Sequence, residues 1–199
     1  MLKHIKLIFF PILLLFTSLK AQEMPELKKA IFATGCFWCT QSDFDKIEGV
    51  LSTTVGYTGG EEENPSYKLV SSGKTQHVEA LELIFDPSIV SYSQLLEVFW
   101  RSSDPTTNEG QFCDIGKQYR PVIFYLDEEQ EKLAQTSKED LLDKQYFPEI
   151  LVDILPTKTF YPAEDYHQNY YKKNPLRYKF YRSRCGREKR LKEIWKNKK

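Results

Sequence analysis

Residues 30–39 read AIFATGCFWC, and this stretch decides the fold because it joins a strand directly to a helix. Its first four residues are apolar and predict a short buried strand, and Gly35 permits a tight turn after it. From Phe37 to Ile47, apolar side chains recur at helical spacing. Cys36 is therefore expected at the N-terminus of a helix.

Further strands and helices are expected along the rest of the chain. We predict strands at residues 50–57, 78–85, 121–126 and 150–155, and helices at residues 95–100, 127–144, 162–173 and 188–196. Ser91 and Gln94 have the spacing of a capping box ahead of the first of these helices. The order strand, helix, strand, strand, helix, strand is the split βαβ, ferredoxin-like pattern. It predicts one α+β domain, a two-layer sandwich with helices on one face of a mainly antiparallel or mixed sheet.

The balance of charge argues against a nucleic-acid partner. The chain has 28 basic and 28 acidic residues and a formal net charge of +0, so it carries no basic footprint. The C-terminal run at residues 182–199 is basic, but such a run is typical of a solvated helix face.

Four cysteines, Cys36, Cys39, Cys113 and Cys185, leave several interpretations open. In an exported protein an even number first suggests structural disulfides, and a non-catalytic domain held by them is one interpretation. Cys36 and Cys39 form a C-x-x-C pair, so a general thiol–disulfide oxidoreductase is another. A zinc site is not expected, because zinc takes about four ligands and no second C-x-x-C is present.

The expected place of Cys36 favours a reactive thiol. At a helix N-terminus the sulfur faces free amide N–H groups and the positive end of the helix dipole. Both favour the thiolate, which is the nucleophilic form. A buried structural cysteine fits this position equally well when the residue is taken alone.

A family resemblance begins at this cysteine. Gly35-Cys36-Phe37-Trp38 resembles the active-site signature of the A-type peptide methionine sulfoxide reductases. Six further blocks resemble the same family and occur in its order: VGYTGG (55–60), NPSY (64–67), HVE (77–79), DPT (104–106), GKQYR (116–120) and AEDYHQ (163–168). The resemblance implies an enzyme that restores oxidised methionine, in proteins or free, and it alone implies the S epimer of the sulfoxide.

The resemblance also implies the roles of five residues. The Cys36 thiolate attacks the sulfoxide sulfur, and Glu79, kept protonated by burial, gives a proton to the departing oxygen. Tyr67 and Tyr119 resemble the two hydroxyls that hold this oxygen. Asp114 resembles a supporting carboxylate near the nucleophile.

The substrate's methyl group needs an apolar wall. Phe37 and Trp38 resemble that wall, where sulfur–aromatic contacts favour the thioether. His167 is interpreted as a structural, hydrogen-bonded histidine. Neither a metal nor an organic cofactor is implied.

The sulfenic acid left on Cys36 needs a second thiol to become a disulfide. We expect Cys185 to supply it, because related enzymes often carry the recycling cysteine in this region and because a glycine and two arginines flank it. Cys39 and Cys113 are the alternatives. A thioredoxin-like partner is expected to reduce the disulfide.

The start of the chain has the composition of an export signal. Two lysines precede an apolar run at residues 7–16, which is too short to span a bilayer, and small and polar residues follow up to Ala21. We therefore expect a signal peptide at residues 1–21, a catalytic domain with a C-terminal extension at residues 22–199, and a periplasmic or secreted protein with no membrane contact beyond export. An uncleaved membrane anchor is the alternative.

Overall fold

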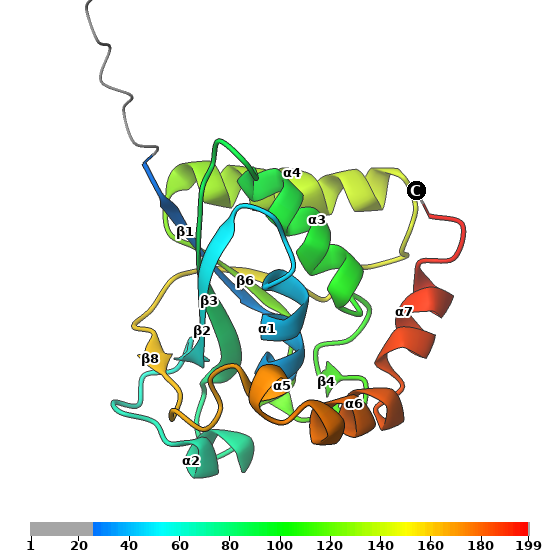
Figure 1. Ribbon diagram of the computed structural model, residues 1–199. Helices are drawn as coiled ribbons and strands as arrows, with labels where there is room; N and C mark the ends of the chain where they lie inside the picture. The colour runs from blue at the N-terminus through cyan, green and yellow to red at the C-terminus, as the bar shows by residue number, and fades with distance from the viewer. Residues whose placement is uncertain (1–25, 199) are drawn as a thin grey trace, which may run out of the picture.

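A six-stranded sheet runs through the protein, with the strands in the order β7-β6-β1-β3-β2-β8 (Figure 1). The computed structural model describes residues 26–198. The strands of this sheet are β1 (Lys28–Ala33), β2 (Val50–Thr58), β3 (Val78–Phe85), β6 (Val122–Tyr125), β7 (Asp153–Pro156) and β8 (Tyr161–Pro162). A separate small ladder pairs β4 (Gly110–Gln111) with β5 (Asp114–Ile115).

Seven helices and one short 3-10 turn are present among the described residues. They are α1 (Phe37–Phe44), α2 (Tyr67–Ser71), α3 (Tyr92–Ser102), η1 (Lys117–Tyr119), α4 (Glu128–Asp143), α5 (Tyr170–Lys173), α6 (Pro175–Arg184) and α7 (Arg187–Ile194). The capping box ahead of α3 is confirmed, since the side chains of Ser91 and Gln94 each accept a hydrogen bond from the other's backbone N–H.

The predicted ferredoxin-like α+β fold is confirmed by the pairing of the strands. The four central strands, β6-β1-β3-β2, pair antiparallel with one another, and β3 lies between β1 and β2. At the edges, β7 pairs in parallel with β6 and β8 pairs antiparallel with β2, which makes the sheet mixed. This arrangement brings the C-terminal end of β1, where Cys36 follows, next to the N-terminal end of β3.

The core lies mainly between the sheet and the helices α1, α3 and α4, which Figure 1 shows on one side of the sheet. Its centre is Phe32, whose ring packs within 5.2 Å of Phe44, 5.8 Å of Tyr92 and 5.6 Å of Phe99, measured between centroids. The neighbouring side chain, Ile31, belongs to a smaller cluster on the other face, because successive residues of a strand point to opposite faces. The larger cluster fills the space between the sheet and the helices, as expected for a two-layer fold.

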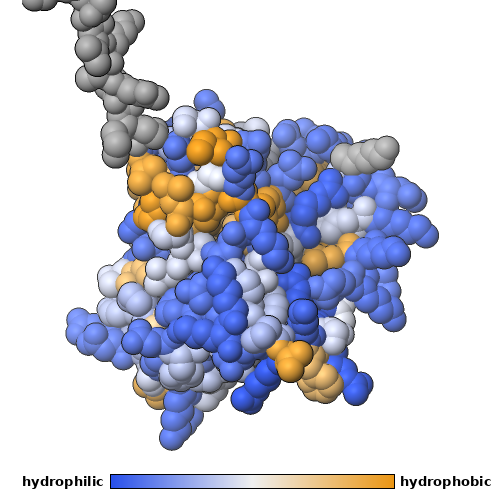
Figure 2. All heavy atoms as spheres, viewed as in Figure 1, coloured by the Kyte–Doolittle hydropathy of each residue, from blue (hydrophilic) through white to orange (hydrophobic). Residues whose placement is uncertain are grey.

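The surface is mainly hydrophilic on the face drawn in Figure 2, with one apolar area near the start of α3 and a smaller one over α6. On α6, Leu176 and Phe180 are 83% and 63% exposed. None of the helices in residues 26–198 is long and apolar enough to cross a bilayer. The predicted signal peptide at residues 1–21 lies outside the described residues.

The predicted helix at residues 162–173 is wrong for most of its length. Its first residue belongs to β8, and only Tyr170–Lys173 is helical. The intervening residues instead continue the sheet edge through side chains, because Gln168 donates to the carbonyl of Val55 and accepts from its N–H. Asn169 then takes a left-handed conformation, with φ of 55°, which starts α5.

Two other differences concern the start of one strand and the presence of one helix. The strand predicted at residues 150–155 begins only at Asp153. The helix α6 was not predicted, although Pro175 stands at its first turn, where proline is favoured. Helix α6 matters for the site, because it carries a side chain that lines the cavity described next.

Candidate active site

Cys36 lies at the N-cap of α1, as the sequence predicts, and it is 6% exposed. The turn before it depends on Gly35, whose φ is +97°. A Cβ atom at Gly35 would lie 2.6 Å from Cβ of Gln111, so the loop that carries Gln111 closes tightly over this turn.

The thiol opens into a small cavity of about 60 Å³. The cavity is lined by Cys36, Phe37, Trp38, Tyr67, Glu79, Asp114, Tyr119 and Tyr181. The first seven of these are the catalytic and substrate-binding residues that the sequence predicts, and the fold brings all of them together from α1, α2, β3, β5 and η1. Tyr181, from α6, was not predicted.

Glu79 is the buried acid of the cavity. Its side chain, on β3 opposite Tyr57 of β2, is 2% exposed. One carboxyl oxygen, Oε2, accepts a hydrogen bond of 3.0 Å from the backbone N–H of Phe37. Burial nevertheless raises the pKa of Glu79 to about 8, because this single hydrogen bond does not offset the loss of water. The group is therefore largely protonated at neutral pH and can act as a proton donor.

Two phenol groups face the same space. Burial raises the pKa of Tyr67 to about 12 and raises the pKa of Tyr119 as well, so both hydroxyls remain donors at physiological pH. The position of Tyr67 is fixed by Glu164, whose carboxylate accepts from the Tyr67 N–H at 3.0 Å and from the Tyr57 hydroxyl at 2.8 Å.

The aromatic wall is held rigid by its neighbours. Trp38 stacks on Tyr170 with 3.8 Å between ring centroids, and its indole N–H donates to Nδ1 of His167 at 3.0 Å. Burial lowers the pKa of His167 to about 4, so the ring is neutral and accepts this bond. His167 also packs on Phe37 and Tyr67, at 5.0 and 4.2 Å between centroids, which agrees with the structural role expected for it.

Tyr181 closes the cavity from the C-terminal side. Its hydroxyl donates to Oδ2 of Asp114 at 2.5 Å, and its ring meets Trp38 edge-on at 5.8 Å. Burial raises the pKa of Asp114, although the bond from Tyr181 opposes the shift. The sequence offers little signal for Tyr181, since a tyrosine in a polar helical run is usually an ordinary surface or rim residue.

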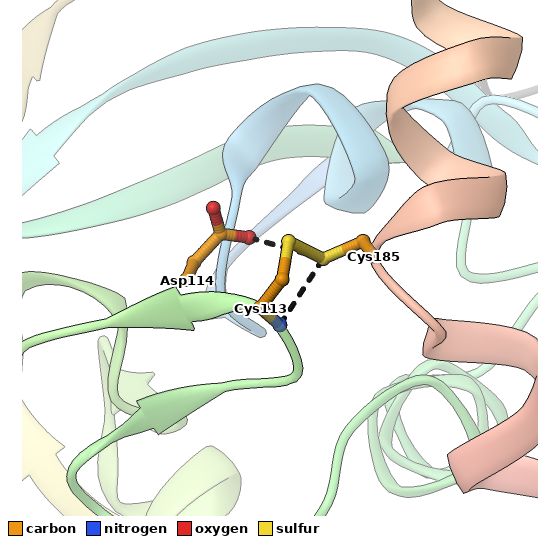
Figure 3. Close-up of side chains that lie close together, drawn as sticks. All are labelled: Cys113, Asp114 and Cys185. Atoms are coloured by element: carbon orange, nitrogen blue, oxygen red, sulfur yellow. Dashed lines mark hydrogen bonds between the residues drawn. A yellow bond between two sulfur atoms is a disulfide. The ribbon is translucent and has the colours of Figure 1, made fainter.

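The four cysteines fall into two pairs. Cys113 and Cys185 form a disulfide with 4.8 Å between their Cα atoms, and Sγ of Cys185 lies 3.7 Å from Oδ2 of Asp114 (Figure 3). Cys36 and Cys39 are free thiols, both are buried, and they are hydrogen-bonded to each other. The structure thus brings Cys185 beside the cavity but bonded to Cys113, while Cys39 touches the nucleophile.

The protonation states of Cys36 and Cys39 differ from the sequence-based expectation that Cys36 is a thiolate. Burial raises the pKa of Cys36, and the hydrogen bond to Cys39 adds to the shift. The pKa of Cys39 falls to about 7, because it accepts that hydrogen bond and lies near two arginines. At the N-terminus of α1, the N–H of Phe37 donates to Glu79, so it is not available to a Cys36 thiolate. Cys36 therefore rests as a thiol that donates to Cys39.

Among residues 26–198, one group of three side chains could in principle bind a metal ion. Its potential ligand atoms lie within 4.8 Å of one another and belong to Cys113, Asp114 and Cys185. Its two sulfur atoms are bonded to each other, so the group is a disulfide beside a carboxylate.

Comparisons with known proteins agree on one family. The family model described as "Peptide methionine sulfoxide reductase" matches residues 28–199. A peptide methionine sulfoxide reductase MsrA of Ligilactobacillus salivarius is 50% identical over 167 residues, which are 83% of this chain and 96% of that protein. The MsrA/MsrB protein of Vibrio cholerae is 48% identical over 169 residues, 84% of this chain, but this chain spans only 45% of that longer protein.

Solved structures support the same relationship. Reduced Mxr1 from Saccharomyces cerevisiae superposes with a TM-score of 0.70 at 36% identity, covering 75% of this chain and 86% of that one. A second structure of Mxr1, in complex with Trx2, has a TM-score of 0.53 at 25% identity, with 77% of this chain and 91% of that chain covered.

Proposed function

The chain belongs to the peptide methionine sulfoxide reductase family, and we propose that it reduces methionine sulfoxide, in proteins or free, through the thiol of Cys36. The observation that carries this proposal is the meeting of Cys36 with a protonated Glu79 in one aromatic-walled cavity. A sulfur nucleophile, a proton donor and an apolar wall are what oxygen transfer from a sulfoxide to a thiol requires.

In the proposed step, the S-methyl group lies against Phe37 and Trp38, and the sulfoxide oxygen points toward Tyr67 and Tyr119. These two hydroxyls are donors held in place before the reaction begins, so they stabilise charge that develops on the oxygen. Since the methyl group and the oxygen are fixed by different walls, the cavity has the means to separate the two epimers. The choice of the S epimer rests on the family resemblance.

The chemical step itself moves one oxygen atom. Cys36 gives its proton to Cys39, whose pKa near 7 suits it as an acceptor, and its sulfur attacks the sulfoxide sulfur. The attack forms an S–S bond, and Glu79 protonates the sulfoxide oxygen. The resulting hydroxyl group moves to the sulfur of Cys36 while its bond to the substrate sulfur and the S–S bond both break, which releases the thioether and leaves Cys36 as a sulfenic acid. The proton left on Cys39 replaces the one that Glu79 gave.

For recycling, we keep Cys185 as the thiol that attacks the sulfenic acid, with release of water and formation of a Cys36–Cys185 disulfide. Cys113 then attacks the sulfur of Cys185, which frees Cys36 and leaves a Cys113–Cys185 disulfide. The existence of that disulfide beside the cavity residue Asp114 supports this order. The contact between Cys39 and Cys36 supports Cys39 as the alternative first resolver.

A thioredoxin-like dithiol is the proposed final reductant. Cys113 is exposed, so a protein thiol can reach the disulfide from outside. The complex of the related Mxr1 with Trx2 supports a partner of this kind.

The activity is tested with the two epimers of a methionine sulfoxide peptide, offered separately with thioredoxin and its reductase. We expect consumption of the S epimer alone, and no consumption by the Cys36→Ser variant. A disulfide substrate is offered in parallel. Reduction of the disulfide without reduction of either sulfoxide would identify a general thiol–disulfide oxidoreductase instead.

The proposed export is tested separately. The apolar run and the small residues up to Ala21 support a cleaved signal peptide and a periplasmic or secreted enzyme. N-terminal sequencing of protein isolated from its own host should find a mature chain that begins close to residue 22. A chain that begins at Met1 in the cytosol would contradict export.

A further inference from the structure

Arg187 is a buried charge that the mechanism above does not use. It is the first residue of α7, two positions after Cys185, and it is 1% exposed. Burial of a guanidinium is costly unless a carboxylate or hydrogen bonds compensate it. The nearest carboxylate oxygen, Oδ2 of Asp43, lies 3.9 Å from Nε of Arg187, and neither atom has a hydrogen-bond partner. The charge is therefore only weakly compensated by Asp43.

The hydrogen bonds of Arg187 go to neutral oxygens around the nucleophile turn. Its Nη2 donates to the carbonyl of Ser102 at 2.6 Å, and to the carbonyl and hydroxyl of Thr34, both at 3.2 Å. Its Nη1 lies 3.8 Å from the position that a Cβ atom of Gly35 would take. The guanidinium thus sits directly against the two residues that precede Cys36.

Two hydroxyl groups extend this contact to the nucleophile itself. The Thr34 hydroxyl is 2.8 Å from the Thr40 hydroxyl, and the Thr40 hydroxyl donates to the carbonyl of Cys36 at 3.3 Å. Both threonines are fully buried. A continuous hydrogen-bonded chain therefore links the guanidinium of Arg187 to the backbone of Cys36.

Arg187 also has an electrostatic effect on the thiols of α1. In a water-poor interior a charge acts over a longer distance than at the surface. The positive charge of Arg187 contributes to the lowered pKa of Cys39, after the hydrogen bond from Cys36. The other charged or titratable groups near it are Asp43 of α1, Asp114 of β5, Arg182 of α6 and Glu188 of α7.

We propose that Arg187 is a positioning residue of the reaction, which holds the turn before Cys36 by hydrogen bonds and whose charge favours the thiolate of the neighbouring Cys39. This inference rests on the proposed function for the reaction that it serves. It assigns to helix α7 a part in the first chemical step, separate from any part in recycling.

The test compares Arg187→Met and Arg187→Lys with a matched control, Arg190→Met. Arg190 lies on the same helix, but it is half-exposed and donates to Asp104 at 2.6 Å and to Thr106, not to Thr34 or Ser102. The first measurement is the rate of iodoacetamide alkylation of Cys36 and Cys39 as a function of pH, with the Cys113–Cys185 disulfide intact. The second is the single-turnover rate of sulfoxide reduction.

For Arg187→Met we expect the alkylation midpoint to move to higher pH and the single-turnover rate to fall on the order of 10²-fold, as for a misplaced catalytic group. Arg187→Lys should keep the midpoint, because the charge remains, but lose rate, because an ammonium cannot reproduce the planar fork. Arg190→Met should match the parent in both measurements.

Parent-like rates and midpoint in Arg187→Met overturn the proposal. If that variant does not fold, Arg187→Lys decides: a parent-like single-turnover rate in the lysine variant overturns the positioning role, and a slowed rate with an unchanged midpoint supports it. The alkylation measurement uses no sulfoxide, so a failure of the proposed function, seen as a parent enzyme without activity, is distinguished from a failure of this inference.

Discussion

The two cysteine pairs of this protein differ in depth, redox state and surroundings. Cys36 and Cys39 are free thiols on α1 and are buried, whereas Cys113 and Cys185 are joined and the first of them is exposed. Cys36 of the inner pair faces a protonated acid and aromatic rings, and Cys113 of the outer pair is exposed to a macromolecular reductant. Under the proposed function, this difference separates chemistry on the sulfoxide from exchange with a partner in space. Asp114 lies between them, since it lines the cavity and also approaches Cys185.

The largest expected effect breaks the inner pair at its nucleophile. Cys36→Ser should abolish sulfoxide reduction, because the high pKa of a hydroxyl leaves essentially no anion to attack sulfur. Single-turnover product analysis by chromatography measures this. Cys39→Ser serves as the control for loss of a buried thiol and should still form some product. Substantial methionine from Cys36→Ser would remove Cys36 from the mechanism.

The next effect concerns how strongly the reaction at Cys36 depends on Glu79. Glu79→Gln should slow the chemical step by about 10²–10⁴-fold, the contribution of a lost general acid. In the parent enzyme the single-turnover rate should fall as pH rises through about 8, because ionised Glu79 has no proton to give. The variant should lose this decline. An unchanged rate and pH profile in Glu79→Gln would mean that the proton comes from another group.

A third effect separates the two pairs. Cys185→Ser should still yield one methionine per enzyme and accumulate sulfenic acid on Cys36, but lose turnover driven by thioredoxin. Peptide mapping after one pulse of sulfoxide, without reductant, identifies the sulfur species. If the parent enzyme instead forms a Cys36–Cys39 disulfide first, Cys39 is the first resolver and Cys185 acts later.

The smallest expected effect concerns the contribution of the Cys113–Cys185 disulfide to the stability of the fold. Its sequence separation is 72 residues, for which loop-closure entropy predicts a stabilisation of about 4.4 kcal/mol. Urea unfolding of the protein with this disulfide reduced should show a lower midpoint but one cooperative transition. Loss of the folded state on reduction would mark the outer pair as a structural link and contradict its role in exchange.

Much of the site could be predicted because its residues lie in short ordered blocks. Cys36, Phe37 and Trp38 are adjacent, and Tyr67, Glu79, Asp114 and Tyr119 each stand in or beside a recognisable block. The fold was predictable for a similar reason, since the alternation in residues 78–85 and the helical spacing after Cys36 are local signals.

The missed features depend on contacts between distant segments. The bond from Tyr181 to Asp114 joins residues 67 apart, and that from Arg187 to Thr34 joins residues 153 apart. The local spacing of apolar residues does not indicate where helices α6 and α7 pack. The wrong helix at residues 162–173 has the same origin, because Gln168 is drawn to the backbone of Val55, 113 residues away.

The hydrogen bond from the Phe37 N–H to Glu79 has a consequence for survival of the enzyme in the presence of oxidants. Hydrogen peroxide oxidises thiolates, and a neutral thiol reacts with it slowly. Cys36 rests as a neutral thiol because burial raises its pKa, and the N–H that could stabilise its thiolate is occupied by the acid. Cys39 does not line the cavity. We therefore expect peroxide to consume Cys36 more slowly than it consumes free cysteine at pH 7, measured by mass spectrometry of the Cys36 peptide. A repair enzyme built in this way is spared by the oxidants whose damage it reverses.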